Sequence, residues 1–363
     1  MAPVLLLPSQ NCLLPFGRAL REKPSNSSMK QSNQQYFKKS TSTLIKTTSV
    51  PFSNKLLNTT HKTQREVKAS LSKLRRMVLV DSLPDENLPK LAPSVQSLIR
   101  PNSLRSKVWK HFLGVYHVSA NEYINLIQKG KSCVYDKIRN DTFRTLATDQ
   151  KFSERVNEEM LIRVLNASVW KMKSIKDHQS ITYVQGMNVL LAPFLFTMSE
   201  LDAYFSFVTF IQNICPLYVT PTLEGVHSGL KLLDRCLQIL DLKLFIYLKS
   251  KNLTAEIYAF PSVLTLCACT PPLEQVLKLW DFLFAYGIHL NIICVIAQLI
   301  LMRDQLLDAP SPMKLLRTMP ELNAKSIINL TVQLVQQIPD NLYELLVRHP
   351  FDPTRHHQGD DKD

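Results

Sequence analysis

The sequence has few glycines, eight among 363 residues, and they are scattered. A phosphate-binding loop needs glycines where backbone amides must approach the anion. The one Gly-Lys-Ser triplet, at residues 130–132, has Asn125 where such a loop requires its first glycine. We therefore interpret Gly130 as the end of a helix followed by a turn, and we expect the chain to hold no nucleotide or other cofactor of its own.

Metal-binding cysteine patterns are also lacking. The seven cysteines are odd in number, lie mostly among apolar residues and form no C-x-x-C pair. On a presumed helix, the thiols of Cys267 and Cys269 would diverge by about 200°, and His356 and His357 stand in a polar tail. These features indicate a reduced cytosolic chain without a metal site.

Long hydrophobic runs are missing as well. The longest, residues 290–302, spans thirteen residues and includes Asn291 and Gln298. A membrane-spanning helix needs about 20 apolar residues. We predict a buried helix here and no membrane span in the chain.

Acidic residues are scarce at the start of the chain. Residues 1–65 contain ten Lys or Arg and the single acid Glu22, which accounts for +9 of the net charge of +13. The tract is rich in Ser, Thr and Asn and too poor in apolar groups to form a core, so we predict a disordered basic extension. Because the basic excess lies in this tract, nothing in the folded part favours nucleic-acid binding.

Two alternatives stay open for this extension. Its basic, acid-poor composition is also typical of a mitochondrial transit peptide, although Pro3, Pro8 and Pro15 oppose an amphipathic helix. Translation could instead begin downstream, for instance at Met29.

The whole chain is 45% apolar, and the pattern of the sequence after residue 65 is helical. Apolar residues at helical spacing predict one helix through Phe152 and Leu165 and another behind Thr270, where a hydroxyl cap and two prolines mark the start. Ser119 to Glu122 fits a capping box. We expect an all-α fold, with Trp109, Trp170 and Trp280 in the core.

Two short motifs lie about forty residues apart. Residues 138–144 read IRNDTFR, and residues 183–188 read YVQGMN. They resemble the paired I-x-x-D-x-x-R and Y-x-Q-G motifs of TBC-domain GTPase-activating proteins. Residues 104–110 (LRSKVWK) and 276–287 (VLKLWDFLFAYG) resemble two further segments of that family, in the same order.

The resemblance implies a two-lobed helical TBC/Rab-GAP domain in which Arg144 and Gln185 face a shared groove. These residues would act in trans on a Ras-like small GTPase that carries GTP and Mg²⁺: Arg144 would neutralise phosphoryl charge and Gln185 would align water. Asp141, on the same helical face as Arg144, could orient the guanidinium. The further supporting positions are Ile138, Tyr183 and Gly186.

Within the family, the chain is most similar to a fungal branch that acts in mitotic exit. The resemblance covers residues 66–350 and leaves residues 351–363 as a polar tail. It implies a two-component activator with a second subunit in the spindle-position checkpoint, at the cytoplasmic face of the spindle pole body.

Some points remain open on the sequence alone. Many family members have a tryptophan in the segment that here occupies residues 260–266, which puts the partner surface in doubt. Tyr183 could steady the glutamine loop or simply pack the lobe, and Gly186 suits a positive φ or a close backbone approach. The alternative function is a non-catalytic helical scaffold that binds the GTPase or its partner and blocks effectors.

Overall fold

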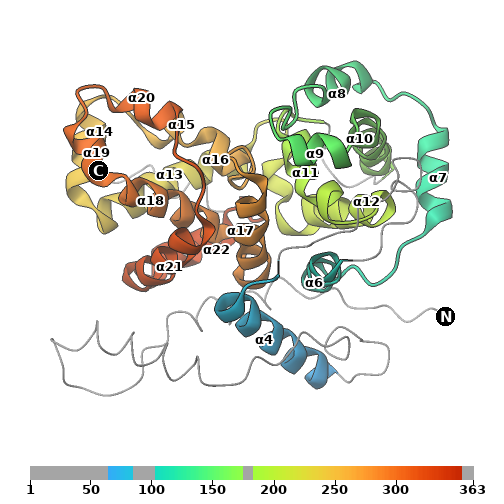
Figure 1. The fold of residues 1–363 in the computed structure, drawn as a ribbon, viewed down its shortest axis with the longest axis horizontal. Coiled ribbons are helices and arrows are strands. Elements are labelled where there is room, and N and C mark those ends of the chain that lie inside the picture. Colours follow the sequence, from blue (N-terminus) through green and yellow to red (C-terminus); the bar gives the residue numbers. More distant parts are fainter. Residues whose placement is uncertain (1–63, 85–102, 175–182, 354–363) are drawn as a thin grey trace.

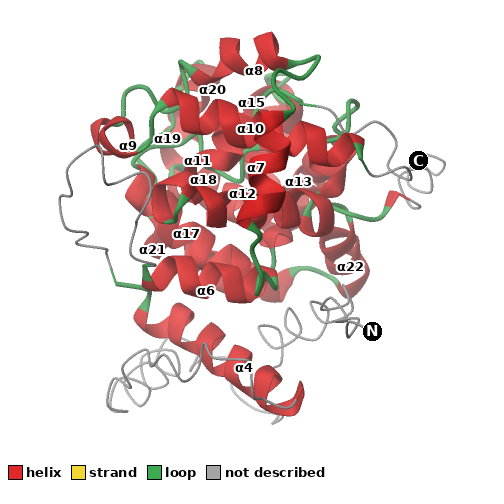
Figure 2. Ribbon diagram, turned by 90° about the vertical axis from the view of Figure 1, so that its right-hand side faces the viewer, coloured by secondary structure: helices red, strands yellow, loops and turns green. Residues whose placement is uncertain are grey.

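The computed structural model describes residues 64–84, 103–174 and 183–353. This part of the chain consists of helices joined by turns and contains no strand (Figure 2), which confirms the all-α prediction. The predictions for most of the basic extension, including the import signal and Met29, and for residues 354–363 of the tail lie outside the described residues.

The helices form two lobes that lie side by side in Figure 1, with α17 (Leu273–Tyr286) between them. The two-lobed prediction is therefore confirmed. The first lobe comprises α6 (Leu104–Leu113), α7 (Ala120–Gln128), α8 (Tyr135–Thr142), α9 (Gln150–Arg155), α10 (Glu158–Lys173), α11 (Met187–Thr197), α12 (Glu200–Thr209), η2 (Phe210–Ile214) and η3 (Pro216–Tyr218).

The second lobe continues the chain from residue 224. Its elements are α13 (Glu224–Leu240), α14 (Leu242–Ser250), α15 (Ala255–Tyr258), α16 (Phe260–Leu264), η4 (Ile288–Leu290), α18 (Asn291–Leu301), α19 (Arg303–Asp308), α20 (Pro312–Arg317), α21 (Ala324–Leu334), η5 (Val335–Gln337) and α22 (Asp340–Arg348). The preceding helix α4 (Gln64–Asp81) packs on α17, where Arg75 Nε donates to the carbonyl of Ala285 at 2.6 Å.

Polar caps set several helix starts. Ser119 Oγ accepts from the amide of Glu122 at 3.2 Å, which confirms the predicted start of α7. The helix expected through Phe152 and Leu165 is interrupted, because Asn157 caps a new helix by accepting from the amide of Met160 at 2.9 Å. The expected hydroxyl cap of α17 is also wrong: Pro272 occupies the N-cap and Leu273 begins the helix.

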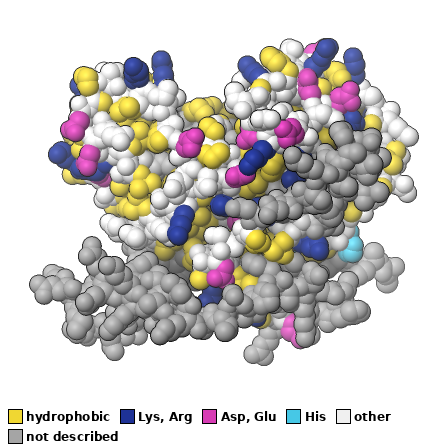
Figure 3. Space-filling view, viewed as in Figure 1, with side chains coloured by type: hydrophobic (Ala, Val, Ile, Leu, Met, Phe, Trp, Pro, Cys, Tyr) yellow, Lys and Arg dark blue, Asp and Glu magenta, His cyan; other side chains and the backbone are white. Residues whose placement is uncertain are grey.

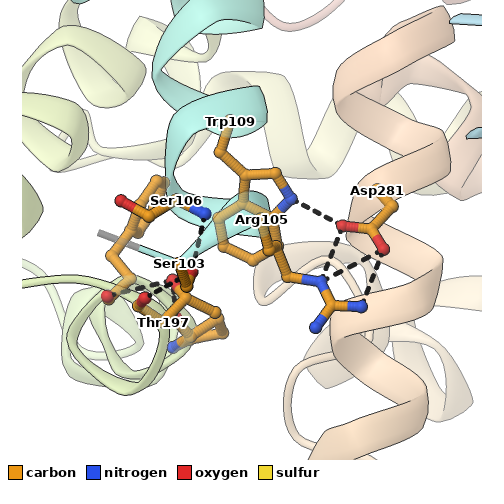
Figure 4. Close-up of polar contacts among 8 residues, drawn as sticks. Ser103, Arg105, Ser106, Trp109, Thr197 and Asp281 are labelled. Carbon is orange, nitrogen blue, oxygen red and sulfur yellow. Dashed lines mark hydrogen bonds and ion pairs between the residues drawn. The ribbon is translucent and has the colours of Figure 1, made fainter. Parts of the chain in front are cut away.

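A buried ion pair and an aromatic cluster join the lobes. Arg105 of α6 and Asp281 of α17 are 3% and 2% exposed, and Arg105 Nε lies 3.0 Å from Asp281 Oδ1. Trp109 Nε1 donates to the same oxygen at 2.7 Å (Figure 4). The Trp109 ring packs against Phe284 at 4.9 Å between centroids. The motif segments at residues 104–110 and 276–287 therefore form the junction between the lobes.

The three tryptophans differ in burial. Trp109 and Trp280 are fully buried, as predicted. Trp170 is only partly buried, and its indole donates to the carbonyl of Gly130 at 3.0 Å. Gly130 itself has φ +71 just after α7, which is the helix end and turn expected there.

The segment around Cys267 differs from the sequence prediction. Leu266 and Cys267 have positive φ and lie in turns, so the presumed helix through Cys269 is wrong. Cys267 is buried and Cys269 is exposed. The buried helix expected at residues 290–302 is confirmed as α18. Across the described ranges, no helix is both long enough and apolar enough to span a membrane.

Candidate functional site

Arg144 lies in the turn that follows α8. The inner face of this helix is buried at Ile138 and Asp141, with Ile138 fully inaccessible. The Arg144 side chain is 55% exposed. The sequence therefore anchors the helix end through an apolar and an acidic residue while leaving the guanidinium in solvent.

The buried Asp141 carboxylate forms an ion pair with the Arg144 guanidinium. Its Oδ1 accepts from Arg144 Nη2, and its Oδ2 accepts from the Tyr183 hydroxyl at 2.9 Å. Burial, together with the hydrogen bond to Asp141, raises the pKa of Tyr183 well above its ordinary value, so the hydroxyl stays protonated and donates. Asp141 thus uses both carboxylate oxygens to fix Arg144 on one side and the glutamine loop on the other.

Asn188 adds a second link between the two motifs. Its Nδ2 donates to Thr145 Oγ1 at 2.8 Å and lies 3.3 Å from the carbonyl oxygen of Asp141. Its Oδ1 accepts from the amide of Gly186 at 3.1 Å. Sequence reasoning assigned no role to Asn188 or Thr145. The sequence indicated them only by their position, because Thr145 directly follows Arg144 and Asn188 lies two residues after Gly186.

Gln185 is exposed in a turn between buried neighbours, Val184 and Gly186, just before α11. Gly186 adopts the positive φ expected there, +105. A Cβ at this position would lie 2.8 Å from Leu264 Cδ2, so the loop also makes the expected close approach. Leu264 ends α16, within the segment that lacks the family's tryptophan. That departure therefore lies directly beside the glutamine loop.

The glutamine loop lies where the lobes meet, because Gly186 approaches Leu264 of the second lobe. In Figure 1, α8 and α9 face α16 across the space between the lobes, and Figure 3 shows the surface hollowed there. Both views of the ribbon put α8 and α15 at one end of the molecule and α4 at the other (Figures 1 and 2). The hollow is thus far from α4.

The predicted site residues fall into one connected unit. Asp141, Tyr183 and Gly186 belong to the hydrogen-bond network, Ile138 packs in the core beneath it, and Arg144 extends from it into solvent. Gln185 is held through its backbone neighbours. The Tyr183 ring is fully buried, so it packs in the lobe. Its hydroxyl also donates to Asp141, so it connects the glutamine loop to the arginine motif.

In the part of the chain with described side chains, no three His, Cys, Asp or Glu gather closely enough to hold a metal ion. The exposed side chains of the two motifs are instead a guanidinium, on Arg144, and a primary amide, on Gln185. Both can donate hydrogen bonds to an anion, and the amide can also hold a water molecule.

Comparison with known proteins identifies relatives along most of the chain. Residues 102–307 match the Rab-GTPase-TBC domain. The chain is 49% identical over 283 residues to "Cell division control protein 16" of Schizosaccharomyces pombe, covering 78% of this chain and 89% of that protein. It is 41% identical over 297 residues to "Mitotic check point protein BUB2" of Saccharomyces cerevisiae, covering 78% and 93%.

A solved structure shares the fold at low sequence identity. The Ypt/Rab-GAP domain of Gyp1p superimposes with a TM-score of 0.56 at 16% identity, covering 76% of this chain and 92% of that one. The matched residues 102–307 include both motifs, the Arg105–Asp281 pair and the Leu264 contact.

Proposed function

The chain belongs to the Rab-GTPase-TBC domain family, and from this membership we propose that it activates GTP hydrolysis by a Ras-like small GTPase. One observation supports the proposal most strongly: a single buried carboxylate, Asp141, is bonded both to the exposed Arg144 and to the Tyr183 of the glutamine loop. Such a network holds the Arg144 side chain and the loop that carries Gln185 on one support, which suits catalysis by pre-organised groups.

In the proposed mechanism, Arg144 enters the nucleotide site of the GTPase. Its planar, permanently charged guanidinium donates to the γ-phosphate oxygens and the β–γ bridging oxygen as negative charge develops there. Gln185 aligns the attacking water in place of the glutamine of the GTPase. GTP and Mg²⁺ belong to the partner, so this chain needs no cofactor of its own.

The supporting residues have positioning roles in this proposal. Asp141 orients the guanidinium through its ion pair with Arg144, and the Tyr183 hydroxyl orients Asp141. Gly186 lets the glutamine turn pack against Leu264, and Ile138 anchors α8. None of these four would touch the nucleotide.

We further propose that the GTPase acts in a mitotic checkpoint. The support is the similarity to a cell division control protein and a mitotic check point protein over 78% of this chain. A second activator subunit and a position at the cytoplasmic face of the spindle pole body complete the proposal. Both rest on the resemblance of the motifs to that branch of the family.

The alternative is a helical scaffold that binds the GTPase without accelerating hydrolysis. Binding without hydrolysis does not require an exposed arginine that is oriented by a buried carboxylate. The exposure of Arg144 together with its ion pair to Asp141 therefore favours the catalytic function.

The test is single-turnover GTP hydrolysis by a panel of Rab and Ras-like GTPases, with and without the full chain. Arg144→Ala should reduce the stimulated rate by roughly 10³-fold or more while the chain stays folded. The melting temperature should fall only modestly, because the Arg144 side chain that is lost from the ion pair with Asp141 is 55% exposed. Arg139→Ala removes an exposed arginine from α8, the helix that precedes the turn of Arg144, and serves as the matched control. An unchanged rate in Arg144→Ala would contradict the proposal.

A further inference from the structure

Phe143, the residue immediately before Arg144, has an unusual environment for an aromatic side chain. It is 66% exposed. Elsewhere in the described ranges no large hydrophobic side chain is as exposed, and the next, Ile246, reaches 56%. Single exposed apolar residues are common on protein surfaces. What distinguishes Phe143 is its position beside the exposed guanidinium.

The backbone that carries Phe143 is held on both sides. Thr142 is buried, and its Oγ1 lies 3.1 Å from the carbonyl oxygen of Arg139 and 3.3 Å from Glu158 Oε1. Thr145 is also buried; its amide donates to the carbonyl of Thr142 at 3.0 Å, and its Oγ1 donates to that of Asp141 at 3.1 Å. Phe143 is therefore displayed on a fixed turn.

We propose that Phe143 is an affinity and specificity determinant that docks against an apolar patch bordering the nucleotide pocket of the GTPase. The inference rests on the proposed function. Adjacent Cα atoms are about 3.8 Å apart, so the Phe143 backbone lies next to any surface that receives Arg144, and its exposed ring is within reach of that surface. A rigid aromatic side chain loses little conformational freedom on binding, and such residues dominate many interfaces.

Phe143 therefore discriminates between GTPases by the surface next to their nucleotide, whereas Arg144 acts on the phosphates that all of them share. Partners with a polar or charged surface at this place would bind weakly, because the ring would then cover polar groups left without hydrogen bonds.

The experiment compares Phe143→Ala, Phe143→Leu and the control Ile246→Ala, all in the full chain. Two quantities are measured with the most strongly stimulated GTPase of the panel: the half-saturating activator concentration in single-turnover hydrolysis, and the dissociation constant for the GTPase loaded with a non-hydrolysable GTP analogue. Phe143→Ala should raise both by about tenfold or more, with the saturating rate within about twofold of wild type. Phe143→Leu should recover part of the affinity, and Ile246→Ala should change nothing.

The outcomes separate this inference from the proposed function. If Phe143→Ala binds as tightly as wild type, the docking role is wrong whatever the rates are. If the wild-type chain binds the GTPase but does not accelerate hydrolysis, the catalytic proposal fails, and the binding titration still decides on Phe143. If no GTPase of the panel binds the wild-type chain, both proposals are contradicted.

Discussion

The Tyr183 hydroxyl donates a 2.9 Å hydrogen bond to Asp141 across 42 residues of sequence. The same carboxylate accepts from Arg144, so the bond connects the loop that carries Gln185 to the turn that carries the arginine. Because Asp141 is only 5% exposed, water cannot easily replace the missing partner if the hydroxyl is removed.

We therefore expect Tyr183→Phe to weaken both the fold and the function. The lost hydrogen bond should lower the free energy of unfolding by about 1–2 kcal/mol. The stimulated rate should also fall, by about tenfold, because Asp141 holds the guanidinium less firmly. Urea denaturation and single-turnover hydrolysis measure the two effects.

Tyr123→Phe is the matched control for this substitution. The Tyr123 side chain is also buried, and its hydroxyl donates to Glu200 Oε1 at 2.7 Å, on other helices of the same lobe. It should lose similar stability without losing stimulation. Equal rates in the two variants would show that the Tyr183 bond serves the fold alone.

The buried pair at the lobe junction gives a prediction about stability. Asp281→Asn keeps the shape of the side chain but removes the counter-charge that faces the buried Arg105 guanidinium. Breaking a buried ion pair typically costs about 3–5 kcal/mol. Glu274→Gln, in the exposed pair with Lys151, should cost less than about 1 kcal/mol. Similar denaturation midpoints for the two variants would contradict the structural role of Asp281.

The buried His289 should make the free energy of unfolding decrease in acid. Burial and, second, the neighbouring His349 lower the pKa of His289 to about 3. The imidazole thus stays neutral in the fold, while in the unfolded chain it takes up a proton below its ordinary pKa of about 6.5. Because the unfolded state binds more protons between these values, stability falls as pH falls through about 6.5.

The size of this effect follows from the same shift. Between pH 7.5 and pH 5.5, His289 alone should reduce the free energy of unfolding by about 1 kcal/mol. In His289→Gln the pH-dependent loss should be smaller by that amount, whatever the overall stability of the variant. His117→Gln removes an exposed histidine and is the control. A loss equal to the wild-type loss in His289→Gln would refute the assignment.

Much of the fold could be predicted from the sequence because local signals carried it. The Ser119 cap, the turn at Gly130 and the buried helix at residues 290–302 each depend on residues close together in the chain. The wrong prediction of one helix through Phe152 and Leu165 has a different cause. Asn157 splits one apolar pattern into α9 and α10, and the apolar residues on its two sides are still at helical spacing.

The site could be predicted only as two separate motifs. Nothing in the spacing of residues 138–144 and 183–188 indicates that Asn188 bonds to Thr145, because that contact arises when α11 packs beside α8. The contact of Gly186 with Leu264 likewise joins segments from different lobes. Tertiary packing therefore supplied what the sequence could not: the shared support beneath Arg144 and Gln185.

The central claim is that this chain supplies both the arginine and the glutamine for hydrolysis. Its most direct test is single-turnover GTP hydrolysis by a responsive GTPase whose own catalytic glutamine has been replaced by leucine. We predict that the wild-type chain still stimulates this GTPase, and that Gln185→Ala and Arg144→Ala each abolish the stimulation while the variant chains stay folded. Loss of stimulation by the wild-type chain on this GTPase would contradict the claim, because the water would then be held by the GTPase and not by Gln185.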